Sequence, residues 1–127
     1  MTWNRQPVAQ ALVSLLGPAC GVTVHERPPE TLNFPCLVVM RPTQVLYGAA
    51  GLGMDEVELP VAAVHGIETD DLVDNLKNAA RTAILGNQGL GGVVKACWPN
   101  SERNWRNVTG AGGVQLLYVE LILIIWM

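Results

Sequence analysis

The chain has 127 residues, of which 50% are hydrophobic and 15% are charged, and its formal net charge is −3. This length predicts one domain, large enough to bury about two thirds of its unfolded surface. An average soluble domain is about one quarter charged, so this chain has either an unusually large core or surface that is buried between subunits. The acidic balance argues against a nucleic-acid-binding protein that neutralises phosphates.

Cysteine usage and the amino end give expectations about compartment. Three widely separated cysteines, Cys20, Cys36 and Cys97, are odd in number and form no C-x-x-C motif, so we expect no disulfide framework and favour a reducing compartment. Residues 1–7 include no apolar segment behind a basic one, so no signal peptide is expected and the protein should begin in a cytosol.

The first third of the chain predicts a helix and two strands. Asn4 or a neighbour can cap a helix whose apolar residues recur at helical spacing, and Gly17 and Pro18 should end it. Residues 21–26 predict a short strand. A proline-containing loop then leads to a buried strand over residues 36–41.

Residues 43–53 predict a glycine-rich loop that nevertheless keeps apolar side chains. A purely solvated loop would not need them, so we expect contacts with another subunit or partner. The four residues are Val45, Leu46, Tyr47 and Leu52. The following residues, 55–65, alternate as a strand with one wet face. Pro60 cannot donate to a ladder, which predicts either an edge strand or a bulge there.

The second half predicts a helix and at least two strands. Residues 69–85 have a helical apolar stripe, acids in the first turn and Gly86 beyond the end. Residues 93–98 predict a strand that Pro99 ends. The next segment mixes charge with one aromatic residue, and we expect a second contact surface at Arg103, Trp105 and Arg106, because Trp and Arg concentrate at interface hot spots.

The last 14 residues, 114–127, predict one long strand, since they are rich in β-branched and aromatic residues and contain no Gly or Pro. Both of its faces are apolar, so both need cover from helices, another sheet or another copy of the chain. A membrane span is not expected, because a spanning helix needs about 20 apolar residues and this run carries Glu120. Its apolar end, including Trp126, is another expected partner contact.

Together these elements predict a single α+β domain over residues 1–127. Its sheet is expected to be mixed and mostly antiparallel, with the two helices packed on one face. With two helices available for one side of the final strand, the other side is left for a subunit neighbour or a second sheet layer.

Catalytic, cofactor and metal chemistry is not expected. The glycines of residues 48–53 and 86–92 precede strands instead of helix N-termini, which is the wrong context for a phosphate loop. His25, His65 and Cys97 lack the short spacing of a recognisable metal site. No serine lies in a nucleophile elbow and no cysteine lies beside a convincing base, so we predict a protein that is not an enzyme.

The ordered features resemble one family across nearly the whole chain, as a profile of individually weak motifs. They are Leu-Leu-Gly at the end of the first helix, Gly-Val-Thr-Val-His-Glu-Arg-Pro-Pro, Phe-Pro-Cys-Leu-Val-Val, Val-His-Gly, the Asp-Asp-Leu-Val-Asp-Asn-Leu helix and the long apolar last strand. This pattern is similar to the tail terminator, or tail completion, proteins of long-tailed siphophages.

The resemblance implies a virion structural protein, made in the host cytoplasm, that forms a hexameric ring. The ring would cap the major tail tube protein, stop tail polymerisation and join a head-closure or neck protein, while DNA passes through the lumen without specific binding. Heterologous contacts that close into a ring fit the low charge. The resemblance implies no catalytic residues and no cofactor.

Two other readings stay open. A head-closure or other neck protein would share the size and composition. A regulatory domain that binds a small molecule would instead use the glycine-rich loop as a ligand lid.

Overall fold

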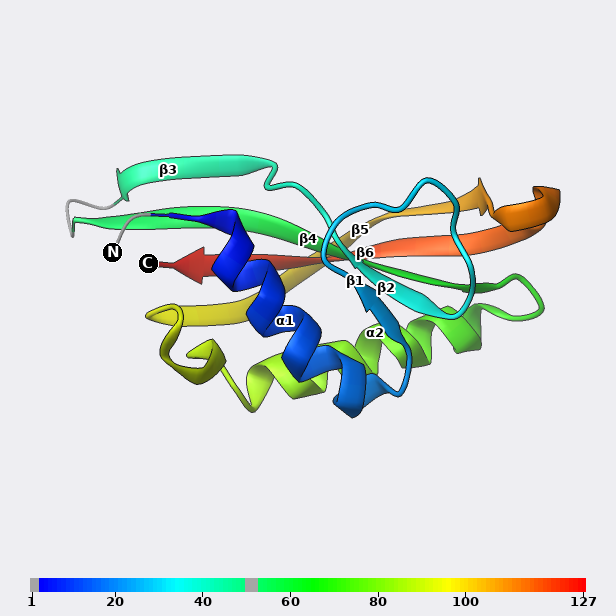
Figure 1. The fold of residues 1–127 in the computed structure, drawn as a ribbon, viewed down its shortest axis with the longest axis horizontal. Coiled ribbons are helices and arrows are strands. Elements are labelled where there is room, and N and C mark those ends of the chain that lie inside the picture. The colour runs from blue at the N-terminus through cyan, green and yellow to red at the C-terminus, as the bar shows by residue number, and fades with distance from the viewer. Residues whose placement is uncertain (1–2, 50–52) are drawn as a thin grey trace.

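The computed structural model describes residues 3–49 and 53–127, which form an α+β fold of two helices and a six-stranded, mostly antiparallel sheet (Figure 1). The strand order is β1-β2-β4-β6-β5, with β3 also paired to β4, and β1–β2 is the parallel pair. The elements are α1 (Arg5–Cys20), β1 (Thr23–His25), β2 (Cys36–Val39), β3 (Gln44–Ala49), β4 (Met54–Gly66), α2 (Asp70–Leu85), β5 (Ala96–Thr109) and β6 (Gln115–Trp126).

Helix α1 begins where the sequence predicts and ends one turn later. The Asn4 side chain accepts a hydrogen bond from the Gln6 N–H at 3.2 Å, which confirms the cap. The expected end at Gly17 and Pro18 is wrong, because proline has a helical φ and removes only one backbone donor. The helix instead ends at Gly21, whose left-handed φ of 65° suits glycine and whose N–H bonds to the Gly17 carbonyl.

Strand β4 lies in the middle of the sheet, although Pro60 predicts an edge or a bulge. Its pairing with β6 runs without a register shift through Pro60 and Ile122. The carbonyl of Pro60 accepts from the Met40 N–H, so its missing donor faces the side where β2 has ended and β3 has not begun. The interruption is therefore in the neighbouring strand, and Pro60 removes no ladder bond.

Strand β5 is longer than predicted and lies at the sheet edge. It continues through Pro99, which pairs with Leu123, and its register shifts between Pro99 and Ser101. An edge position beside a bulge tolerates proline, so the expected strand end at Pro99 is wrong. The strand begins only at Ala96, after a short 3-10 turn over Leu90–Gly92.

Both helices pack on the same face of the sheet. The main core cluster joins the inner stripes of α1 and α2 to alternate residues of β4 and β6. From β4 and β6 it takes Val57, Leu59, Val61, Ala63, Val119, Leu121, Leu123 and Ile125. We call this side the helix face and the opposite side the helix-free face. The final strand is thus a central core strand, as its composition predicts.

Leu123→Ala should lower the free energy of unfolding by about 2–5 kcal/mol, because Leu123 is fully buried and truncation leaves a cavity under the helices. Urea denaturation measures the change. Val114→Ala is the matched control just before the same strand: Val114 is 46% exposed, so its loss should be within about 0.5 kcal/mol. Equal losses for the two variants would contradict this assignment of the core.

Candidate functional site

The helix-free face of β6 is covered unevenly along its length. At the Leu116 and Tyr118 end, a second core cluster joins them to alternate residues of β2 and β4, and Leu32 from the β1–β2 connection packs against it. A loop therefore covers this end, where the sequence predicts a subunit or a second sheet. Figure 1 shows this connection passing across the strands.

The middle of the helix-free face carries a polar network across three strands. Arg103 on β5 reaches over β6 to form an ion pair with Glu58 on β4 and a hydrogen bond with Thr43. Ile122, which lies on β6 between the register partners of Arg103 and Glu58, is 1% exposed. Glu120 accepts hydrogen bonds from the Tyr118 hydroxyl and from the Asn104 amide.

The remaining end of this face, beside β3, is partly open. Register places Leu46, Glu56 and Trp126 in one row across β3, β4 and β6, and Ile124 lies beside Trp98 in the next row. Leu46 is 42% exposed, and the other three apolar side chains are half-buried. We call Leu46, Trp98, Ile124 and Trp126 the open end.

The two tryptophans give the open end a fixed shape. Their rings meet edge to face with centroids 5.0 Å apart, and the Trp126 Nε1–H donates to the Glu56 carboxylate at 2.9 Å. Edge-to-face packing and a satisfied indole hold both rings in one orientation. Trp126 therefore takes part in the surface where a partner contact is expected.

The segment predicted as a loop over residues 43–53 is instead mainly strand β3, paired antiparallel with β4. Its glycines obscured the strand pattern: Gly48 and Gly53 have positive φ close to the hairpin turn. Val45 packs against the helix-face core, Leu46 belongs to the open end, and Tyr47 is 76% exposed. Leu52 lies outside the described residues.

Arg103, Trp105 and Arg106 lie on strand β5, beyond the predicted strand end at Pro99, and each has a partner within the chain. The Arg106 guanidinium lies 4.5 Å from the centroid of the Tyr118 ring. Burial raises the pKa of Tyr118, and its hydrogen bond to Glu120 acts in the same direction. The two arginines thus stabilise the helix-free face, and whether they also contact a partner stays a prediction.

Trp105, on strand β5, lies close to the buried ammonium group of Lys77, which belongs to helix α2. The Trp105 Nε1–H donates to Glu102 at 2.7 Å, and Lys77 Nζ lies 5.9 Å from the indole ring. Lys77 Nζ also lies 2.7 Å from an oxygen of Asp74 and of Glu102. With 42% exposure, Trp105 covers this ion cluster and still presents surface.

The ion cluster shifts the pKa of two members in opposite directions. Burial lowers the pKa of Lys77, but hydrogen bonds to Asp74 and Glu102 outweigh it, so the net shift is upward. The hydrogen bond from Lys77, helped by that from Trp105, lowers the pKa of Glu102. Lys77 and Glu102 therefore keep their opposite charges together through the neutral pH range.

Groups considered for metal or nucleophilic chemistry lie apart. The described residues contain no cluster of three or more His, Cys, Asp or Glu side chains that could hold a metal ion. The cysteines Cys20, Cys36 and Cys97 are free thiols, and burial raises the pKa of Cys36 to about 11 and that of Cys97 to about 12. Both thiols are therefore protonated at neutral pH and poorly nucleophilic.

Sequence reasoning missed Trp98 and Ile124 as members of the open end. The strand was expected to stop at Pro99, which hid the register that places Trp98 beside Ile124. The alternation of side chains along the final strand does place Ile124 and Trp126 on one face, so two of the four residues of the open end could have been grouped from the sequence.

No profile of a known protein family and no curated protein sequence matches this chain. Within the described residues, no helix is long and apolar enough to cross a bilayer.

Lys77→Met should reduce the loss of folding stability that occurs as the pH falls from 6 to 3. Because the folded-state pKa of Glu102 is lowered, its contribution is complete above its unfolded value of 4.5 and is lost as pH falls through the lower folded value. Melting temperatures at pH 6 and pH 3 should therefore differ less in the variant. Lys95→Met, which removes an exposed lysine, should leave the difference unchanged; a wild-type acid response in Lys77→Met would refute the linkage.

Proposed function

We propose that this protein is a ring-forming tail terminator subunit of a long-tailed phage, which caps the tail tube and offers a joining surface to the head. The observation that carries the proposal is the open end: two oriented tryptophans with Ile124 and Leu46, on the face away from both helices. Contiguous exposed apolar surface of this kind marks interaction sites, and Trp is enriched at interface hot spots.

The sheet also has two unlike outer strands, which suit the head-to-tail contacts of a ring. Strands β3 and β5 flank the β4–β6 pair on opposite sides, and the end of β3 lies at the opposite end of the long axis from the β5–β6 turn (Figure 1). A heterologous contact joins two different patches, one from each neighbour, and closes when the rotation between copies allows. Tyr47 beside one edge and Trp105 near the other supply exposed aromatic surface for two such patches.

The net charge of −3 suits a conduit for DNA better than a binder, because an acidic lining repels phosphates. The partners of the proposed ring are further copies of the chain, the tail tube protein on one side and a head-closure or neck protein on the other. No catalytic step is part of this function.

Mass measurement tests the proposal directly. Native mass spectrometry and light scattering across a range of concentrations should detect rings of about six chains, which negative-stain images should show as annular particles. Purified tail tubes should bind the protein at their ends. A monomer at every concentration that also fails to bind tail tubes would refute the proposal; binding to DNA-filled heads in place of tubes would favour the head-closure alternative.

Leu46→Glu should weaken assembly at least tenfold, since it places a charge beside Glu56 in the open end without touching the core. The ring fraction at fixed concentration, read by light scattering, measures the effect. Leu85→Glu is the matched control, because Leu85 is 41% exposed but lies at the end of α2. If the control disrupts rings and Leu46→Glu does not, the open end is not the interface.

Trp105→Ala should weaken assembly by about 2 kcal/mol or more, the scale of an interface hot spot, while the monomer stays folded. Sedimentation gives the association constant and circular dichroism reports the fold. A variant that loses its fold would instead assign Trp105 to the intramolecular ion cluster around Lys77 alone.

A further inference from the structure

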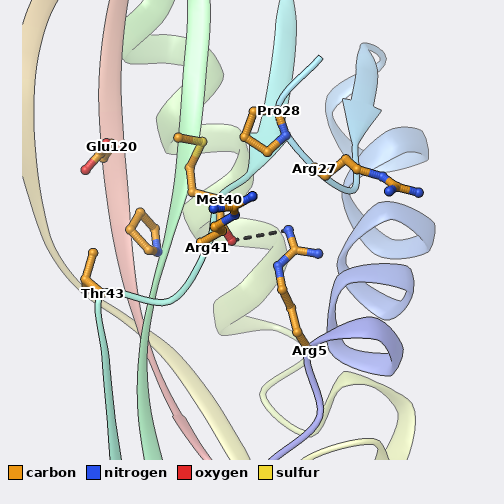
Figure 2. A pocket seen from close by; sticks show the side chains of 8 residues that line it. Arg5, Arg27, Pro28, Met40, Arg41, Thr43 and Glu120 are labelled. Atoms are coloured by element: carbon orange, nitrogen blue, oxygen red, sulfur yellow. Dashed lines mark hydrogen bonds between the residues drawn. The ribbon is translucent and has the colours of Figure 1, made fainter. Parts of the chain in front are cut away.

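A basic pocket of about 660 Å³ lies beside the start of α1, on a chain whose net charge is negative. Three of the eight lysines and arginines of the chain line it: Arg5 from the first turn of α1, Arg27 after β1, and Arg41 after β2. Figure 2 shows the Arg5 guanidinium between the other two arginine side chains. Three segments that are distant in sequence thus each bring an arginine to the lining of this pocket, although the Arg27 guanidinium extends away from Arg5 (Figure 2).

Arg5 is anchored by neutral groups. Its Nη2 donates to the backbone carbonyls of Glu26, Val39 and Met40, at 2.5, 2.8 and 3.3 Å. In Figure 2 the other terminal nitrogen points away from the carbonyl of Met40. These bonds fix the orientation of the guanidinium but leave its charge uncompensated, so little side-chain entropy remains to be lost when an anion binds.

Acids near the pocket do not balance the arginines. Arg27 Nη2 lies 3.7 Å from Glu26 Oε1 in an exposed ion pair. Arg41 has no ion-pair partner in the part of the chain that the structure describes. Glu120 also lines the pocket, and its hydrogen bonds from the neutral groups of Tyr118 and Asn104 do not cancel its formal charge. Two carboxylates thus stand against three arginines, which leaves an excess of one positive charge. Burial lowers the pKa of Arg5, Glu26 opposes that shift, and the neighbouring Arg27 and Arg41 add to it.

We propose that this pocket binds a phosphate group, either free phosphate or the phosphate of a small monoester. Planar guanidinium groups match phosphate oxygens with paired hydrogen bonds, and a phosphate offsets the positive charge that the three arginines carry in excess of Glu26 and Glu120. The pocket is larger than a phosphate ion needs. Its apolar wall, Pro28 and Met40, offers contact to the organic part of an ester.

Calorimetry and thermal unfolding of the whole protein test the site with two probes, inorganic phosphate and glycerol phosphate, at constant ionic strength. Both should bind and raise the melting temperature, and tighter binding of the ester would identify an organic phosphate as the preferred source. Arg41→Ala should weaken the binding of each probe at least tenfold. Arg81→Ala removes an exposed arginine on α2 and should bind as the wild type does.

Arg27→Gln is a second variant. Because the Arg27 side chain is exposed, this variant should stay folded, so a loss of binding could not be explained by unfolding. The proposal is overturned if neither probe binds, if chloride at equal ionic strength gives the same shift in melting temperature, or if both pocket variants bind as the wild type does. Duplex DNA that binds while both small probes fail would also overturn it. Because the readout needs no ring, its failure is separate from that of the proposed assembly.

Discussion

The pairing of β4 with β6 is the constraint on which the rest of the structure depends. The two strands pair over 11 consecutive residue pairs without a register shift, strands β2, β3 and β5 each pair with one of them, and helix α2 packs on both. Because β6 is apolar on both faces and β4 is apolar on one, the pair cannot be stable alone in water. Two helices cover one face. On the other face, a loop covers one end, Arg103 crosses the middle, and the last part is partly exposed.

This graded cover connects folding to the proposed assembly. The same β6 strand contributes Leu123 to the helix-face core and Trp126 to the open end, so a partner docked there would rest on the most rigid part of the molecule. Little conformational entropy would be lost on binding, because the Trp98 and Trp126 rings are already oriented. The phosphate pocket, by contrast, depends on side chains delivered by loops and a helix start.

The sequence was sufficient for the α+β fold class, for α2 and for the long final strand, because composition and periodicity act locally there. Predictions from the sequence were wrong where they depended on a proline or glycine whose neighbouring strand was unknown. Pro60 faces a gap between strands and Pro99 faces an edge bulge, and neither partner is visible from local sequence. The open end and the arginine pocket depend on sheet register and on the path of the β1–β2 connection, which are properties of the tertiary structure.

Glu120 has a consequence for how the final strand finds its place. Since β6 is apolar on both sides, hydrophobicity alone would hardly distinguish the native alignment from one slipped by a single position, which exchanges the two faces. A slip would carry the carboxylate of Glu120 beneath the helices, away from Tyr118 and Asn104, and leave a buried charge without its donors. Glu120 therefore helps to specify the register of a strand whose two apolar faces would otherwise allow either alignment.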